Sequence, residues 1–241
     1  MTLQPIEVRP SAVEACAGSL RDAVLRGDFV EGARLPPERQ LAQTLGVNRV
    51  TVRGALSRLV VEGLLSVRQG SGYVVQDFLA SGGPELLPAL VGHADRQGAS
   101  TLVKDLLEVR RGLAQVVLTR LAGRRVKKAE LAAIERAISA MEACAAGPLR
   151  DVAEADFAVL SAVVAATGSA AFRLTLNPIG QVLLTLPGLA AAMYRAPLEN
   201  VAAWRVLAGW LAAPVPEGIP LILSALAERD EATVQQLKRK S

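Results

Sequence analysis

The first 80 residues alternate between apolar ladders at helical spacing and short links rich in glycine and proline. The ladders predict three helices, over 11–25, 38–45 and 48–62. In the third, the apolar positions follow the i, i+3, i+4, i+7, i+8 pattern of a helix that packs on one side. These positions are Val52, Ala55, Leu56, Leu59 and Val60. Gly46-Val47 predicts a tight turn between the second and third helices.

Two short β-prone runs follow the third helix, over 65–67 and 73–75, and Gly70-Ser71-Gly72 separates them. Such runs joined by a glycine-rich link predict a hairpin. Three helices and a hairpin in this space are typical of a winged helix-turn-helix, which we expect over 1–78. The stretch 79–98 contains Gly82-Gly83-Pro84 and predicts a linker and a connecting helix.

From residue 99 to residue 241 no run predicts a strand, and the apolar spacing indicates a second, all-helical domain. Counting the connecting helix, we expect helices near 86–95, 100–123, 128–145, 149–167, 170–192, 198–212 and 217–240. The fifth would be broken by its prolines, and the last is open to interruption at Arg229-Asp230. The predicted fold class is mainly α: an N-terminal winged helix-turn-helix plus a C-terminal all-α helical-bundle effector domain, which would bind the ligand and dimerise.

Composition supports that fold class, because apolar residues make up 51% of the chain and aromatic residues only 3%. A core of Ala, Leu and Val suits packed helices better than an aromatic-rich sandwich. Residues 174–194 carry no charge, but Asn177, Pro178, Gln181 and Pro187 interrupt them. We expect a buried, kinked helix pair there and no membrane span.

Arginine is concentrated in residues 34–68, which contain six arginines and two glutamates. Arg49, Arg53 and Ser57 share one stripe of the third helix, beside its buried face. In a helix-turn-helix the second helix of the motif enters the major groove, where arginine can bond guanine with two hydrogen bonds. Solvated surface arginines are the competing interpretation, but the turn, the wing and Arg39 all fit DNA docking. Asn48 and Thr51 would reach phosphates or bases.

The stretch GDFVEGARLPPERQLAQTLGVNRVTVRGALSRLVVEGLLSVRQGSGYVV resembles the DNA-binding domain of GntR-type transcription regulators. The resemblance implies that Arg39, Arg49, Arg53 and Gly70 hold the positions of DNA-contacting residues, while Asn48 stands where Ser or Thr is commoner. Gln69 and Gly70 form the wing tip, for which a solvated turn is the alternative. The complete set of predicted DNA contacts is Arg39, Asn48, Arg49, Thr51, Arg53, Gln69 and Gly70.

The second domain resembles the ligand-binding domain of the FadR-type branch of that family, through DLLEVRRGLAQVVLTRLAGRR at 105–125 and ADFAVLSAVVAATGS at 155–169. Many members of this branch hold a divalent metal with one Asp and three His. Asp156 matches the Asp, but Leu160 stands four residues on, and the later positions fall at Gly218 and near Lys240. The only histidine is His93. One carboxylate without imidazoles is a poor transition-metal site, so we predict no metal and no cofactor.

The missing histidines favour the metal-free type of ligand domain, which responds to fatty acids. An acyl chain needs an apolar cavity, and eight residues would line it, with ordinary core as the alternative for each: Leu160, Val163, Leu183, Leu184, Met193, Trp204, Leu207 and Trp210. Arg110, in Glu108-Val109-Arg110, would bond a carboxylate or phosphate of the effector. A salt bridge with Asp156 or Glu108 is the competing role. The predicted ligand contacts are Arg110, Asp156, Leu160, Trp204 and Trp210.

These patterns favour a homodimeric, ligand-responsive regulator that binds a palindromic DNA operator and represses until a small-molecule effector binds. The effector would be a fatty acyl-CoA or another apolar metabolite; a small carboxylate, or a sensor domain that only dimerises, are the alternatives. An enzyme is disfavoured, because no nucleophile–base pair, metal cluster or phosphate loop is recognisable. Cys16 and Cys144 form no C-x-x-C pair and the N-terminus does not resemble a signal peptide, so we expect a cytoplasmic location.

Overall fold

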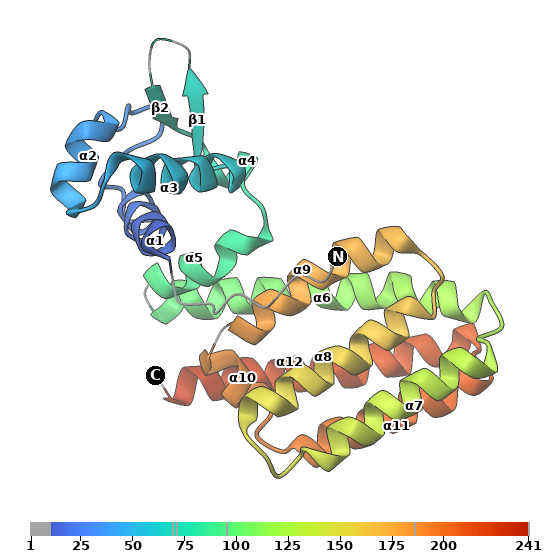
Figure 1. Cartoon of the computed structure of the whole chain (residues 1–241). Helices are drawn as coiled ribbons and strands as arrows, with labels where there is room; N and C mark the ends of the chain where they lie inside the picture. Colours follow the sequence, from blue (N-terminus) through green and yellow to red (C-terminus); the bar gives the residue numbers. More distant parts are fainter. Residues whose placement is uncertain (1–10, 69, 71, 95, 186, 241) are drawn as a thin grey trace. The chain divides into compact units, whose positions relative to one another are not determined.

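The computed structural model describes residues 11–240 except 69, 71, 95 and 186. The chain divides into two compact units, Met1–His93 and Ala94–Ser241, and each is described by itself (Figure 1). The division lies between His93 and Ala94. The expected boundaries of 1–78, 79–98 and 99–241 stay a prediction.

The three helices of the first unit are α1 (Ala12–Leu25), α2 (Glu38–Leu45) and α3 (Arg49–Val61), each within about one residue of its predicted range. Local chemistry sets their ends. The Asn48 side chain accepts a hydrogen bond from the Thr51 backbone N–H, which caps α3. Gly46 ends α2 in the left-handed conformation that glycine adopts without strain.

One apolar core joins these helices. Val52, Ala55, Leu56 and Leu59 of α3 have no exposed surface. They pack with buried residues of α1 and α2, which are Cys16, Ala17, Leu20, Val24, Leu41 and Ala42. The predicted inner face of α3 is therefore confirmed at its four central positions, and Val60 lies at the partly buried edge of the same core.

The wing is an antiparallel pair, β1 (Leu65–Arg68) and β2 (Gly72–Val75), in which Leu65 lies opposite Val75. Gly63 makes the turn from α3 into β1 with φ +77°, and a Cβ on it would lie 2.2 Å from the Ser81 carbonyl oxygen. Only glycine fits that approach. Ser81 ends α4 (Phe78–Ser81), which η1 (Pro84–Leu86) and α5 (Leu87–His93) follow.

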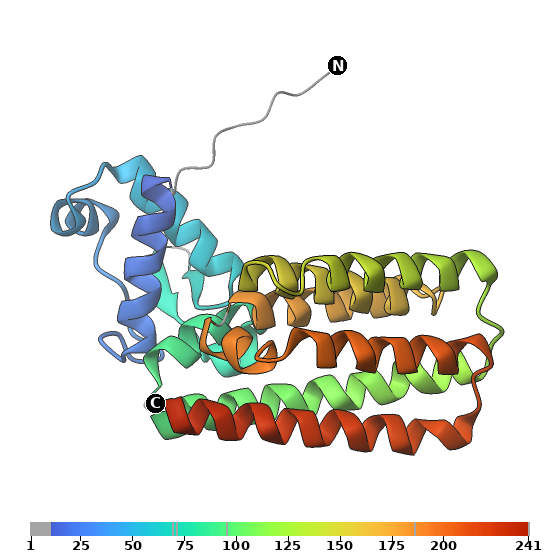
Figure 2. The same ribbon diagram turned by 90° about the horizontal axis from the view of Figure 1, so that it is seen from below.

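The second unit is all helical within its described residues. Its elements are α6 (Arg96–Ala122), α7 (Lys128–Ala143), α8 (Leu149–Ala165), α9 (Ala170–Thr185), α10 (Pro187–Met193), α11 (Pro197–Ala212), η2 (Pro216–Gly218) and α12 (Ile219–Lys240). The long helices α6 and α12 lie side by side (Figure 2), and α7 packs against α8 and α11. Leu121, Ile134, Met141, Val159 and Leu211 are among the fully buried side chains of their common core. The predicted mainly helical fold class is confirmed.

The break that the prolines predict within 170–192 is present, since α9 ends at Thr185 and α10 begins at Pro187. One detail differs from the sequence-based expectations. The interruption expected at Arg229-Asp230 is wrong, because α12 is continuous there and Asp230 is only 3% exposed. Its carboxylate accepts hydrogen bonds from Arg110 and Arg111 of α6, which pay for its burial inside the helix pair.

The apolar stretch 174–194 is distributed over α9, α10 and the start of the following turn. In the described part of the chain, no helix has both the length and the apolar character that crossing a bilayer would require.

Candidate DNA-binding surface and effector site

The outward side of α3 carries the two arginines that the sequence singled out. Arg49 and Arg53 have side chains that are 62% and 63% exposed, although they lie within one turn of the fully buried Val52. Because the apolar face of α3 packs on α1 and α2, the arginine stripe faces away from the core. Ser57 continues it one turn later and is also exposed.

Asn48 and Thr51 are already engaged within the fold. The Asn48 side-chain oxygen lies 2.8 Å from the Thr51 backbone nitrogen that it caps, and the residue itself stays exposed. Thr51 is only 8% exposed, so most of its side chain faces the core. Between them Val50 is 80% exposed, which sequence reasoning missed. Its position off the buried ladder is the signal that could have revealed it.

Glu38, at the start of α2, pairs with both arginines of the stripe. Its two carboxylate oxygens accept hydrogen bonds from Arg53 Nε at 3.1 Å and Arg53 Nη2 at 2.8 Å. Arg49 Nη2 lies 4.0 Å from the same carboxylate. The hydrogen bonds from Arg53 are the largest influence that lowers the pKa of Glu38 below its ordinary value, so the carboxylate is ionised at neutral pH.

The remaining predicted DNA contacts lie on α2 and at the wing. Arg39 follows Glu38 on α2 and is exposed. Gly70 has φ +75°, and a Cβ there would meet no atom within 4 Å, so the backbone conformation alone favours glycine. Gln69 lies outside the described residues.

In the second unit, Asp156 of α8 is the centre of a polar cluster within the helical core. One carboxylate oxygen accepts a hydrogen bond from Trp204 Nε1 at 2.5 Å and the other accepts one from the Tyr194 hydroxyl at 3.0 Å. Burial raises the pKa of Asp156, while these hydrogen bonds and the charges of Arg110 and Arg229 oppose that shift. Burial and the adjacent carboxylate also raise the pKa of Tyr194.

Arg110 forms a salt bridge, but its partner is Asp230 and not Asp156 or Glu108, the two partners that the sequence suggested. Arg111 Nη1 lies 2.7 Å from the second oxygen of Asp230. Arg110 Nε is buried and has no hydrogen-bond partner among the described residues, so one guanidinium donor is open to an acceptor.

Three of the five predicted ligand residues meet in this cluster: Asp156 and Trp204 in direct contact, with Arg110 close enough to act on the Asp156 charge. Leu160 packs against the apolar core. Trp210 instead donates a hydrogen bond to the Val215 carbonyl oxygen at 3.1 Å. The side chains of Leu183 and Leu184 lie outside the described residues.

Sequence reasoning missed five members of the cluster: Arg111, Tyr194, Asn200, Arg229 and Asp230. Asn200 accepts a hydrogen bond from Arg229 Nη2 at 2.5 Å. Asn200 and Asp230 are both buried, which is unusual for residues of these types. Their burial cannot be recognised from the sequence, because their partners lie far away along the chain.

The metal site that the family pattern implies does not fit the residues around Asp156. Both carboxylate oxygens already accept hydrogen bonds, and the position four residues on is the apolar Leu160. Gly218, which we aligned with a ligand histidine, lies against the Trp210 indole. No three His, Cys, Asp or Glu side chains gather as metal ligands within the described residues. That this domain works without a metal stays a prediction.

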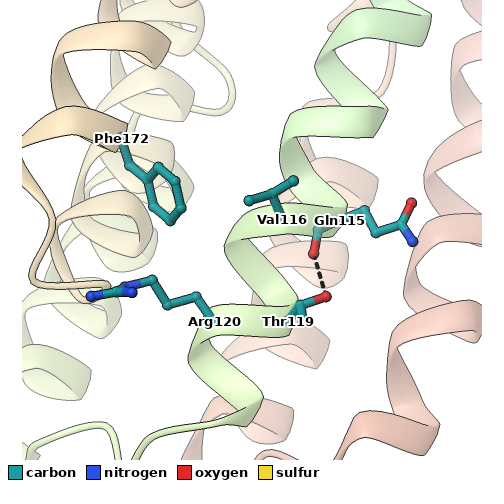
Figure 3. Close-up of a pocket in the computed structure, with 5 residues that line it drawn as sticks. All are labelled: Gln115, Val116, Thr119, Arg120 and Phe172. Atoms are coloured by element: carbon teal, nitrogen blue, oxygen red, sulfur yellow. Dashed lines mark hydrogen bonds between the residues drawn. The ribbon is translucent and has the colours of Figure 1, made fainter.

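A separate open groove of about 540 Å³ lies between α6 and α9 (Figure 3). It is lined by Gln115, Val116, Thr119, Arg120 and Phe172. Arg120 Nε donates to the Thr167 carbonyl oxygen at 3.2 Å, and its guanidinium lies 5.8 Å from the centre of the Phe172 ring. These contacts tie α6 to the start of α9.

A capped, arginine-bearing helix on a winged three-helix core, joined to a helical bundle with a buried polar cluster, defines a DNA-binding transcription regulator with an effector domain. Comparison with known families agrees. Residues 12–75 match the family of bacterial regulatory proteins of the gntR type, and residues 105–240 match the FCD domain. The chain therefore belongs to the GntR family of transcription regulators and carries an FCD domain.

Curated relatives match part of the chain. An uncharacterized HTH-type transcriptional regulator, Rv0494 of Mycobacterium tuberculosis, is 38% identical over 143 residues, which are 58% of this chain and 56% of that protein. The fatty acid metabolism regulator protein of Vibrio cholerae is 32% identical over 97 residues, 40% of this chain and 34% of that protein. The chain thus spans about half the length, or less, of these relatives.

Among solved structures, one described as Lar, which controls the expression of the Listeria monocytogenes agr system, has a TM-score of 0.63. It covers 99% of this chain and 100% of its own, at 14% sequence identity. That similarity shows a shared fold.

The Asp156 cluster predicts how the two tryptophans differ. Trp204→Phe removes the half-buried indole N–H that donates to Asp156 and should lower the free energy of unfolding by about 1–3 kcal/mol. Trp210→Phe is the matched control: it removes the same atoms but loses a hydrogen bond at an exposed site, and should cost less. Urea unfolding, followed by fluorescence of the remaining tryptophan, measures both. Equal losses would contradict the role given to Trp204.

The stability cost of these two tryptophan variants should also depend differently on pH. Because the pKa of Asp156 lies above its ordinary value of 3.8 in the folded state, the folded chain holds this proton more tightly than the unfolded chain. Stability from this group is therefore present at low pH and is lost as the pH rises above that value. The Trp204 N–H supports the ionised form, so the cost of Trp204→Phe should increase with rising pH, whereas that of Trp210→Phe should not.

Proposed function

We propose that this chain is a homodimeric repressor that binds a palindromic operator and releases it when an effector occupies the helical domain. The observation that carries the proposal is the exposed stripe of Arg49 and Arg53 on a helix whose opposite side is fully buried. A helix of this kind enters the major groove and reads base edges from its N-terminal half.

Each predicted contact has a chemical part in DNA binding. Arg49 and Arg53 would bond guanine O6 and N7, and exposed Val50 would contact a thymine methyl group. Arg39, on the neighbouring α2, would bind backbone phosphate. The wing tip at Gly70 would lie along the backbone or the minor groove, where the absence of a side chain permits a close approach.

A second copy would supply the other half of the operator. Two-fold symmetric dimers match two-fold symmetric DNA, with half-sites spaced by a helical turn or a multiple of it. Since its partner is DNA, we expect the protein to act in the cytoplasm.

For the effector we infer an apolar metabolite that carries an anionic group, with a fatty acyl-CoA as the first candidate. The polar cluster holds three guanidinium groups, Arg110, Arg111 and Arg229, against the two carboxylates Asp156 and Asp230, so its formal charge is +1. The open donor Arg110 Nε would bond the anionic group. The apolar side chains around Leu160 would receive an alkyl chain.

The Vibrio cholerae relative, whose name refers to fatty acid metabolism, supports an acyl effector. A small carboxylate, which the same arginines would bind, is the alternative effector. In either case binding would favour one arrangement of the dimer over another and so change operator affinity. The second candidate function is a regulator whose helical domain only dimerises, and it is favoured by the engagement of both Asp156 oxygens within the fold.

The DNA-binding part is tested by Arg49→Ala and Arg53→Ala, each of which should weaken operator binding by about 1–3 kcal/mol. Arg58→Ala is the control, because Arg58 lies on the same helix but its side chain extends toward α1, where it pairs with Glu14. Gel shifts at several salt concentrations measure the affinities. Unchanged affinity in both stripe variants, with circular dichroism showing them folded, would remove the proposal.

The effector part is tested by a thermal-shift screen of acyl-CoAs, free fatty acids and dicarboxylates. A ligand at about 100 times its Kd should stabilise the folded chain by about 2.7 kcal/mol and raise the unfolding temperature. Arg110→Gln should reduce the shift, because it removes the open guanidinium donor. No shift with any of the three classes would favour the purely dimerising domain.

A further inference from the structure

Glu38 is a carboxylate inside the surface that would face DNA, and its position raises a question of charge. DNA repels a carboxylate, yet Glu38 lies within 4.0 Å of both Arg49 and Arg53. Its side chain is 18% exposed, against 62% and 63% for the two arginines. The carboxylate therefore lies beneath the two guanidinium groups, on the side of the protein.

Stability of the fold does not account for this pair. An ion pair with a guanidinium as exposed as that of Arg53 contributes little to folding. What two parallel hydrogen bonds provide is orientation, since Arg53 Nε and Nη2 donate to separate oxygens of one carboxylate. Glu38 thus holds the guanidinium plane in one position.

Glu38 bonds one edge of the Arg53 guanidinium and leaves the terminal edge available to bond a base. A guanidinium has five N–H donors. Glu38 takes one from Nε and one from Nη2, which leaves both donors of Nη1 and the second donor of Nη2. Nη1 and Nη2 together form the terminal edge, which can donate two parallel bonds to guanine O6 and N7.

We propose that Glu38 is a specificity-determining positioning residue: it holds Arg53 so that the terminal edge of the guanidinium faces the bases. This inference rests on the proposed operator binding. Held by Glu38, Arg53 reads a base pair with a preset geometry, and the negative charge beneath it weakens attraction to phosphates of any sequence. Both effects increase the difference between operator and other DNA.

The experiment compares the affinity for two duplexes of equal length and composition, one selected by the wild-type protein from a random-sequence pool and one with its sequence scrambled. Fluorescence anisotropy at fixed salt gives the Kd for each duplex, and the specificity ratio is the Kd for the scrambled duplex divided by the Kd for the selected duplex. Glu38→Gln should lower this ratio about tenfold, while binding to the scrambled duplex is unchanged or tighter. Glu38→Asp keeps the charge but shortens the side chain, and should also lower the ratio.

Two further variants separate positioning from other roles. In an Arg53→Ala background Glu38→Gln should lower the ratio much less than in the wild-type background, because the guanidinium that Glu38 positions is absent and only the effect of its charge is left. Glu31→Gln removes the same charge from an exposed loop of the same unit and should leave the ratio as in the wild type.

The inference is overturned if Glu38→Gln leaves the ratio unchanged, which would make the pair structural only. It is also overturned if the loss is equally large in the Arg53→Ala background, since Glu38 would then contact DNA itself. A wild-type protein that does not distinguish the two duplexes would instead refute the proposed operator binding.

Discussion

The first unit depends on the packing of α3 against α1 and α2. Val52, Ala55, Leu56 and Leu59 have no exposed surface, and burying four such side chains leaves α3 a single rotational setting. Every polar feature of the helix follows from that setting. If the apolar ladder were shifted by one position, Arg49 and Arg53 would still share a stripe, but that stripe would no longer face directly away from the core.

The features around α3 refine this basic arrangement. Asn48 caps the helix at the end where the arginines begin, and Gly63 allows the chain to turn back closely into the wing. Glu38 then joins α2 to the stripe through a fork of hydrogen bonds. The result is a reading surface whose backbone is set by apolar packing and whose side chains are set by a charge pair.

In the first unit the functional charges are exposed, whereas in the second unit they lie inside the fold. Asp156 and Asp230 lie within the helical core and are compensated there by arginines and by the Tyr194 and Trp204 donors. Burying these charges costs desolvation free energy. The cluster favours one packing arrangement of the helices only if its donors and acceptors are satisfied. Among the described residues, Arg110 Nε is the one buried donor of the cluster without an acceptor, and in the proposed function the effector would supply that acceptor.

The sequence predicted whatever is encoded locally. Helix bounds, caps, the hairpin and the arginine stripe depend on residues within a few turns of one another, and α1, α2 and α3 were placed to about one residue. Contacts across the chain could not be predicted. Arg110 and Asp230 are 120 residues apart, and neither periodicity nor spacing links them. The wrong interruption at Arg229-Asp230 has the same origin, because a charged pair reads as exposed until its partners are known.

The most direct test of the account is chemical modification of arginine by phenylglyoxal, located by mass spectrometry, with and without the selected DNA duplex. Arg58 is the internal reference, since it lies on α3 but outside the stripe and pairs with Glu14 of α1. The account predicts that DNA protects Arg49 and Arg53 and leaves Arg58 as reactive as before. Equal modification of Arg49 and Arg53 in the presence and absence of bound DNA would contradict it.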